Sequence, residues 1–251
     1  GTVTVTARAS SEILVNAGSA VSLTFTAADW STPKVVTVSA VDDPVVEGPH
    51  TGTITHSVTG LGFASYPVRT LTVSVVDNET PGALITQSGG STSVVEGGAT
   101  DTYTVVLTAQ PLTNVTVTAT TDGKTTVNGA TPTSLVFTPA SWNSPQTVTV
   151  RAVDDKAVEG THAGTITHSA TGGGFDGISI PSVTVTVGDN DPVPPPTGLK
   201  ATTAAEGLNL VWNSPVGVTV PTGYEVHIST AATGSFTKVK DVVAAAGTAQ
   251  S

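Results

Sequence analysis

The chain has 251 residues, a net charge of −10 and no cysteine. These values exclude a disulfide framework and thiolate metal sites, and nine Lys and Arg residues in an acidic chain argue against nucleic-acid binding, which needs clustered cations. No run of about 18 apolar residues is present, so we expect no membrane-spanning segment. Because only 11% of the residues are charged, Thr and Ser must cover most of the solvent-facing positions.

The chain repeats itself at a fixed spacing. Residues 3–79 align without a gap onto residues 115–191, which lie 112 positions later, and about half of the paired residues are identical. We therefore predict a first repeat over residues 1–80, which lacks the opening third of its partner, and a complete second repeat over residues 81–191.

Alternation of apolar and polar residues predicts strands throughout both repeats. In the first repeat the predicted strands are Val3–Ala7, Val21–Thr26, Val35–Val41, Gly52–Val58 and Leu71–Val76. In the second they are Tyr103–Thr108, Val115–Thr120, Thr133–Thr138, Gln146–Val153, Thr165–Ala170 and Val183–Gly188. No stretch has a helical period, so we predict an all-β protein. Only a few residues around Pro81-Gly82 join the repeats, which favours antiparallel sandwiches arranged end to end.

A proline-rich run over residues 192–196 marks the next boundary, and such a run acts as a semi-rigid spacer. Residues 197–251 hold three more strand-like runs, Leu208–Trp212, Tyr224–Ser229 and Phe236–Val243. They are few for an independent sandwich, so we expect a domain that continues past Ser251.

Acidic residues gather at one pole of the predicted second sandwich. Antiparallel strands reverse at each turn, and counting the strands brings these acids to the pole where the chain leaves for the next unit. They are Glu96, Asp122, Asp154, Asp155, Glu159, Asp189 and Asp191. Acids at strand ends often only cap turns, and that alternative stays open. A cluster of oxygen ligands otherwise selects a hard cation, and calcium takes about six to eight oxygens.

The motifs that carry these acids resemble the Calx-beta family, which is common in bacterial surface proteins. They are Val95-Glu96-Gly97-Gly98, Thr121-Asp122-Gly123, Val153-Asp154-Asp155, Val158-Glu159-Gly160 and Val187-Gly188-Asp189-Asn190-Asp191. The resemblance implies an immunoglobulin-like sandwich of about seven strands and makes the seven acids calcium ligands. Lys156 and Asn190 replace acids of the family pattern, which implies fewer ions or weaker binding.

The resemblance extends to a weaker calcium site in the first repeat and to a different family in the tail. The first repeat keeps Asp42, Asp43, Glu47, Asp77 and Glu79, with Ser10 in the place of Asp122. The tail resembles the start of a fibronectin type III domain in three segments, residues 195–199, 208–212 and 223–226, which implies core positions for Trp212 and Tyr224.

Two repeated pairs of rings have a structural and a functional interpretation. The alternation places His56 and His168 among inward-facing residues, so we predict core histidines with hydrogen-bond partners. Trp30 and Trp142 lie in the turn at the opposite pole, where we expect each ring to close the end of its sandwich rather than to stack on sugars. No motif pairs a nucleophile with a base, so we predict that the chain is not an enzyme.

These features favour a non-catalytic structural or adhesive segment of a large extracellular bacterial surface protein, with calcium stiffening the junctions between repeats. Neighbouring protein modules or subunits are the expected partners, with surface glycans as a further option. One alternative is a set of accessory, non-catalytic modules of a secreted polysaccharide-degrading enzyme. The other is the ordered part of a surface filament subunit, whose first repeat receives strands from a neighbouring chain.

Overall fold

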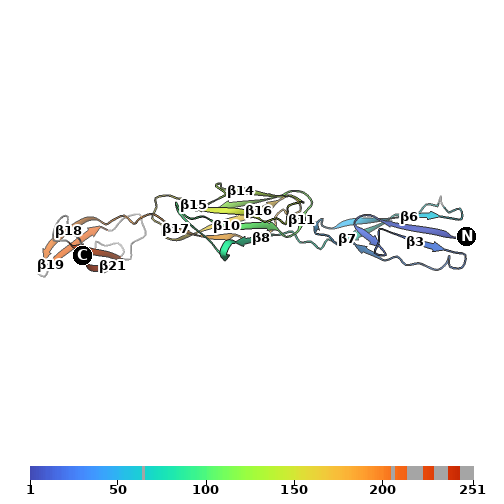
Figure 1. Ribbon diagram of the computed structural model, residues 1–251, viewed down its shortest axis with the longest axis horizontal. Helices are drawn as coiled ribbons and strands as arrows, with labels where there is room; N and C mark the ends of the chain where they lie inside the picture. Colours follow the sequence, from blue (N-terminus) through green and yellow to red (C-terminus); the bar gives the residue numbers. More distant parts are fainter. Residues whose placement is uncertain (64–65, 205–206, 214–222, 229–236, 244–251) are drawn as a thin grey trace.

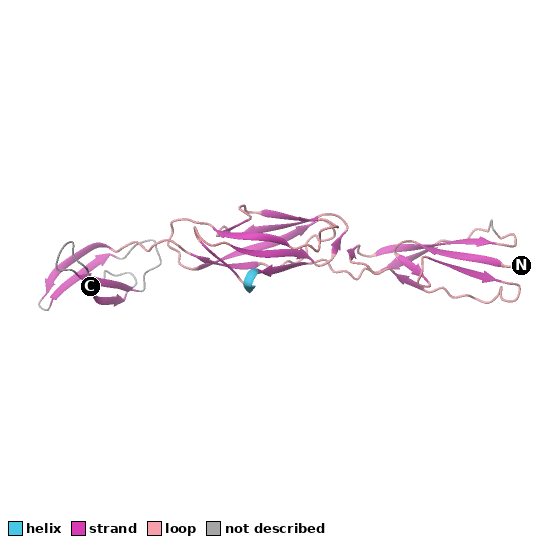
Figure 2. Ribbon diagram, in the orientation of Figure 1, coloured by secondary structure: helices cyan, strands magenta, loops and turns pink. Residues whose placement is uncertain are grey.

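The computed structural model describes residues 1–63, 66–204, 207–213, 223–228 and 237–243. Three β units follow one another along the long axis of an extended molecule (Figure 1). Figure 2 shows strands throughout, with a single short helical turn in the middle unit. Within the described ranges, no helix has the length and apolar character needed to cross a membrane. The predicted all-β, end-to-end architecture is confirmed.

The second repeat is a closed sandwich with sheet orders β13-β15-β10-β8 and β14-β12-β16-β17-β9. Its elements are β8 (Ala83–Gln87), the 3-10 turn η1 (Ser88–Gly90), β9 (Thr92–Val95), β10 (Asp101–Leu107), β12 (Val115–Thr121), β13 (Thr125–Val127), β14 (Thr133–Phe137), β15 (Gln146–Ala152), β16 (His162–Thr171) and β17 (Val183–Gly188). The sheets hold more strands than the resemblance implies, because η1 divides the opening strand between the two sheets and β13 adds a short strand.

Period-two alternation builds the core of the second repeat. Val115, Val117 and Ala119 of β12 are fully buried, whereas Thr116 and Thr118 between them are partly exposed. Complete burial of a Val or Phe side chain contributes about 1.5–3 kcal/mol to folding. The many buried residues of this kind, which include Phe137 and Phe175, therefore supply most of the stability of the second repeat.

The first repeat is an open version of the same sandwich. Its elements are β1 (Val3–Ala9), β2 (Ile13–Val15), β3 (Ala20–Phe25), β4 (Val38–Ala40), β5 (Val45–Val46), β6 (His50–Thr59) and β7 (Leu71–Val75). One sheet has the order β3-β1-β6-β7, and β2 pairs with β4 alone. Within the described residues this repeat has no counterparts of β8, β9 and β10. The predicted strand Val35–Val41 was too long, because β4 has a partner strand on only one side.

The junction between the repeats is a packed interface. β5 pairs in parallel with β11 (Gln110–Pro111), and the backbone amide of Gln110 donates to the Pro44 carbonyl at 2.8 Å. Val46 of the first repeat is only 7% exposed and belongs to the core of the second. Gly174 leaves room for it, since a Cβ there would lie 3.2 Å from a Val46 methyl group. The connection therefore holds the two repeats by side-chain packing as well as by the chain itself.

The tail contributes two antiparallel strand pairs. β18 (Thr197–Ala204) pairs with β19 (Gly207–Asn213), and β20 (Gly223–Ile228) pairs with β21 (Thr237–Val243). Trp212 is 4% exposed, which confirms its predicted core position. The side chain of Tyr224 lies outside the described part of the chain. The fibronectin-like assignment of the tail stays a prediction.

Candidate metal centre

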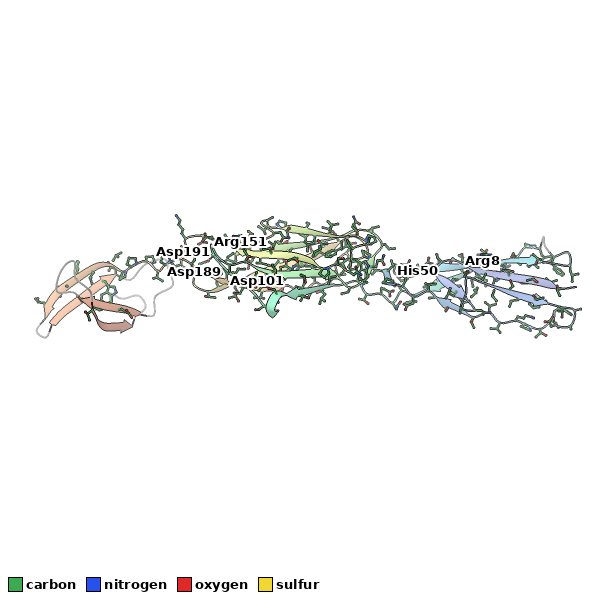
Figure 3. The ribbon with its side chains drawn as sticks, in the orientation of Figure 1. Arg8, His50, Asp101, Arg151, Asp189 and Asp191 are labelled. Carbon is green, nitrogen blue, oxygen red and sulfur yellow. The ribbon has the colours of Figure 1, made fainter. Side chains whose placement is uncertain are left out.

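Three loops meet at the C-terminal pole of the second repeat. β9 and β17 run in parallel with Val95 opposite Gly188, so the residues that follow them begin side by side. The Glu96 amide donates to the Gly188 carbonyl at 2.9 Å. The loop after β15 brings the third set of acids to the same pole. Figure 3 shows Asp189 and Asp191 at the end of the second repeat that faces the tail.

Three carboxylates from these three loops converge on one point. Oxygens of Glu96, Asp155 and Asp191 all lie within 4.8 Å of one another. Glu96 is only 2% exposed, and one of its oxygens has no hydrogen-bond partner within the described residues; the same holds for one oxygen of Asp191. Burying an unpaired carboxylate oxygen is costly, and a cation removes that cost. These orphaned oxygens distinguish the cluster from acids that merely cap turns.

Burial and mutual repulsion change the acidity of the two orphaned groups. Burial, followed by the charge of Asp189, raises the pKa of Glu96 above its usual range. Burial and the same neighbour likewise raise the pKa of Asp191. Both groups are therefore unfavourable as anions at neutral pH unless a cation neutralises them.

Asp189 ties two of the loops together. One of its oxygens accepts the amides of Glu159 at 2.9 Å and Gly160 at 2.7 Å, and the other accepts the amide of Asp191 at 2.8 Å. These bonds, above all the one from Asp191, lower the pKa of Asp189. This carboxylate thus holds the positions of its neighbours.

Asn190 connects the remaining loop. Its side-chain amide donates to the Glu96 carbonyl at 3.0 Å and to an Asp154 oxygen at 3.2 Å. An acid at this position would repel Asp154, whereas the amide binds it. Asn190 therefore holds the Glu96 and Asp154 loops together.

A lysine neutralises the flank of the cluster. The Lys124 ammonium donates to Glu159 at 2.6 Å, and this hydrogen bond raises the pKa of Lys124. Glu96, Glu159 and His162 form a second group with ligand atoms within 4.8 Å. A pocket of about 220 Å³ lies between these side chains, with Asp122 and Asp155 also on its lining.

Asp122 and Asp154 contribute to the candidate site through hydrogen bonds that hold its loops. The Asp122 oxygens accept the amides of Thr165 at 2.8 Å and Lys124 at 3.1 Å, so this residue shapes the turn where the pocket opens. The structure thus brings Glu96, Asp155 and Asp191 together, with Glu159 beside them. It uses Asp122, Asp154 and Asp189 to hold the loops.

In the first repeat the predicted acids mostly cap loops. Asp77 accepts the amides of Glu47 at 2.9 Å and Gly48 at 2.7 Å, and a hydrogen bond with the Glu79 side chain contributes most to lowering the pKa of Asp77 to about 2. The same bond raises the pKa of Glu79. Two further acids also accept hydrogen bonds, Asp42 from the Asn78 side-chain amide at 3.1 Å and Asp43 from the Val45 backbone amide at 2.8 Å.

A different group of possible ligands forms beside these caps. Ligand atoms of Glu12, Glu47 and His50 lie within 4.8 Å of one another, and the His50 ring nitrogen is 3.6 Å from Glu12 and 3.4 Å from Glu47. A hydrogen bond to the Gly48 carbonyl is the main reason that the pKa of His50 is raised. Sequence reasoning placed only Glu47 of these three in the site. The sequence does carry a signal for Glu12: this acid stands where the second repeat has Lys124, so the first repeat has a carboxylate in place of a cation at this position.

The inward histidines and the tryptophans behave differently in the two repeats. His168 bonds the Tyr103 hydroxyl at 2.8 Å and the Pro181 carbonyl at 3.0 Å, which confirms the prediction of a core histidine with partners. Trp142 packs against the core and closes the end of its sandwich, also as predicted. For Trp30 that prediction is wrong, because the ring is 73% exposed at the open end of the first repeat.

No protein-family model and no curated protein sequence matches the chain. Among solved structures it is similar to the apo form of the Calx CBD1 domain, with 21% identity over 43% of this chain and 98% of that one, at a TM-score of 0.32. It is also similar to domains 4 and 5 of the S-layer protein SbsC, with 22% identity over 56% and 65% of the two chains, at a TM-score of 0.26. A third similarity is to the Salmonella enterica SafA pilin in complex with the SafB chaperone, with 9% identity over 66% and 85%, at a TM-score of 0.31.

Proposed function

We propose that this chain is a non-catalytic structural segment of an extracellular bacterial surface protein, in which calcium stiffens the junction that follows each repeat. The observation that carries the proposal is the double role of one loop. The loop from Asp42 to Glu47 carries three of the five acids of the first repeat, and it also inserts Val46 into the core of the second. A cation that orders this loop therefore also orders the joint.

The second repeat has the better-formed cation site. Glu96, Asp155 and Asp191, with Glu159 beside them, would hold the ion, and all their ligand atoms are carboxylate oxygens. Calcium fits this donor set because it is a hard cation that accepts oxygen ligands in irregular geometry. When bound, it supplies the positive charge that the orphaned oxygens of Glu96 and Asp191 lack.

The comparable loop of the second repeat leads toward the tail, for which we propose a fibronectin type III-like domain. Val158 occupies the position of Val46 and is half-buried. The repetition of loop, acids and apolar residue supports one joint design used more than once along the parent protein. Neighbouring modules of the same kind are then the partners of each pole.

A thermal melt in calcium and in chelator tests the proposal. Binding to the folded state alone stabilises it by about 2.7 kcal/mol when calcium is in hundredfold excess over its Kd. We expect a calcium-dependent rise in Tm that the double change Asp154→Ala plus Asp155→Ala abolishes. Asp176→Ala, at the opposite pole, is the matched control and should keep the rise. No shift at millimolar calcium would leave only a sandwich with acid-capped turns.

Glu96→Gln adds a second test, because its expected effect on Tm has opposite signs in chelator and in calcium. The raised pKa of Glu96 means that its anion destabilises the metal-free fold above that pKa and that this cost disappears as the pH falls. In chelator at pH 7 the neutral amide should therefore raise Tm, and in calcium it should lower Tm relative to the parent chain. A loss of stability in both buffers would argue for a purely structural glutamate.

A further inference from the structure

A histidine, which is not a calcium ligand, lies beside the carboxylates of the second pole. The His162 side chain is 18% exposed, and a nitrogen of its ring lies within 4.8 Å of carboxylate oxygens of Glu96 and Glu159. Calcium takes oxygen ligands, whereas imidazole nitrogen suits zinc, copper, iron and nickel. The chemistry of this group therefore differs from that of Glu96, Asp155 and Asp191, although Glu96 belongs to both groups.

The backbone determines which nitrogen of the His162 ring is protonated. Nδ1 lies 3.0 Å from the Gly160 carbonyl, and because a carbonyl only accepts hydrogen bonds, Nδ1 carries the proton. In the neutral ring Nε2 then has a free electron pair, and this atom faces Glu159 at 3.6 Å. Metal-binding histidines are commonly arranged in this way, with one nitrogen bonded to a backbone carbonyl and the other on the metal.

The loop that carries Glu159 is held from two sides. The Gly160 amide donates to Asp189 at 2.7 Å, while its carbonyl accepts the bond from His162. Gly160 has a φ of 68°, a conformation that glycine adopts without strain. His162 is the first residue of β16 and pairs with Val187 of β17. The sheet and Asp189 thus position the ring and the carboxylate relative to each other.

The two oxygens of Glu159 have different neighbours. One accepts a hydrogen bond from Lys124 at 2.6 Å, and the other is the oxygen that faces His162. A separation of 3.6 Å is too long for a hydrogen bond. Tetrahedral zinc holds nitrogen and oxygen ligands at about 2.0–2.2 Å, which places neighbouring ligand atoms about 3.3–3.5 Å apart. The observed spacing is therefore close to that of two ligands of one ion.

Glu96 completes the group with a negative charge. Its side chain is 2% exposed, and one of its oxygens has no hydrogen-bond partner among the described residues. Lys124 pairs with Glu159, so it does not offset this charge directly. The pocket of about 220 Å³ is lined by Glu96, Glu159 and His162 together. It has room for an ion and for a water molecule as the fourth ligand that zinc takes beside three protein ligands.

The first repeat sets a histidine ring in the same way. Residues 47–50 are Glu-Gly-Pro-His, and residues 159–162 are Glu-Gly-Thr-His. Nδ1 of His50 lies 2.9 Å from the Gly48 carbonyl, and Nε2 lies 3.4 Å from Glu47. Figure 3 shows His50 at the end of the first repeat that faces the second. Two loops with different third residues thus orient ring and carboxylate alike, so the arrangement is a property of the motif.

We propose that Glu96, Glu159 and His162 form a site for a divalent transition-metal ion, and that zinc is the ion that best fits one nitrogen and two carboxylate oxygens. This site is additional to the calcium site and does not depend on it. Because Glu96 belongs to both groups and two dications repel each other, each ion should weaken the binding of the other by the same factor. Only this antagonism rests on the calcium site proposed above.

Calorimetric titration with zinc chloride in calcium-free buffer tests the site. The reference chain carries His50→Gln, which removes the corresponding ring of the first repeat. We expect this chain to bind zinc and to gain Tm in zinc. Adding His162→Gln should lower the zinc affinity by more than about tenfold, since loss of a hydrogen-bond partner of a ligand alone costs about 10–100-fold. The same variant should keep its calcium-dependent rise in Tm, which shows that it is folded.

Two further variants separate the zinc site from the calcium site. Asp191→Asn should lose the calcium-dependent rise in Tm and keep zinc binding, whereas Glu96→Gln should lose both. Absence of zinc binding in the reference chain, or equal affinity with and without His162→Gln, would overturn the zinc site whatever calcium does. Loss of the calcium response alone would count against the proposed function and not against zinc. In a chain that responds to calcium, unchanged zinc affinity in saturating calcium would overturn the shared role of Glu96.

Discussion

Lys124 and Glu12 occupy the same position in the two repeats and give the two poles different electrostatics. Lys124 pairs with Glu159 at 2.6 Å, whereas Glu12 adds a third ligand group to Glu47 and His50. A tethered ammonium competes with a free cation for the same carboxylate. We infer that Lys124 weakens the binding of a cation by the carboxylates of the second pole.

Lys124→Met should therefore tighten calcium binding at the second pole and lower Tm in chelator. Partly exposed ion pairs contribute about 0.2–1 kcal/mol, so the expected gain in affinity is no more than about fivefold. Calorimetric titration measures it. Lys156→Met removes the same charge from the acid loop without breaking the pair with Glu159. If both variants changed affinity equally, the effect would be one of net charge alone.

Thr125 is a second position at which the two repeats carry different residues. It is fully buried and its hydroxyl has no partner within the described residues, whereas its counterpart Ile13 is a buried apolar side chain. Leaving a buried hydroxyl unsatisfied costs about 1–3 kcal/mol. Thr125→Val keeps the shape and should stabilise the second repeat by about 1 kcal/mol or more in a denaturant titration. Thr126→Val, on the partly exposed side of β13, should change little; a destabilised Thr125→Val would reveal a hidden partner for the hydroxyl.

At the scale of elements, the joint depends on β5 and β11. A two-residue parallel pairing is weak alone, so the burial of Val46 in the neighbouring core carries the interface. This apolar side chain comes from the repeat on the other side of the joint. Coupling between repeats is therefore built from one loop and one side chain.

Val46→Ala should loosen this joint at a cost of about 1–2 kcal/mol, the usual range for a small deletion in a core. Because Val46 packs in the second repeat, the change in the first repeat should lower the Tm of the second. Val158→Ala is the matched control in the equivalent loop, where the side chain is half-buried and belongs to neither hydrophobic core of the described residues. Equal effects of the two changes would mean that the loop itself, and not the inserted valine, couples the units.

At the scale of the whole molecule, the units form one extended row (Figure 1). Since the acidic loops lie at the joints, calcium should act on the relative motion of the units more than on the shape of each one. Small-angle scattering should give a narrower distribution of overall dimensions in calcium than in chelator, and Val46→Ala should broaden it in both buffers. Identical distributions with and without calcium would contradict the stiffening role.

The sequence by itself determined the longer strands of the two repeats and the pole at which the acids of the second repeat lie, whereas the short strands β2, β5, β8, β9, β11 and β13 were not predicted. Alternation is a local property, so β12, β15 and β17 were predicted to within one or two residues. The assignment of the acids to one pole needed only the count of antiparallel reversals. Glu96 and Asp155 could therefore be predicted to approach each other although they are far apart in the chain.

Only the tertiary structure decided which of these residues are paired and which are covered. Nothing in the local sequence distinguishes Val46 from other loop residues, and it is buried only because it packs in the core of the second repeat. The contact of Lys124 with Glu159 likewise depends on how close two separate loops lie. Trp30 and Trp142 share one local motif, yet one is exposed and the other packs against a core. Burial depends on neighbours distant in sequence, so identical local patterns lead to an open first repeat and a closed second one.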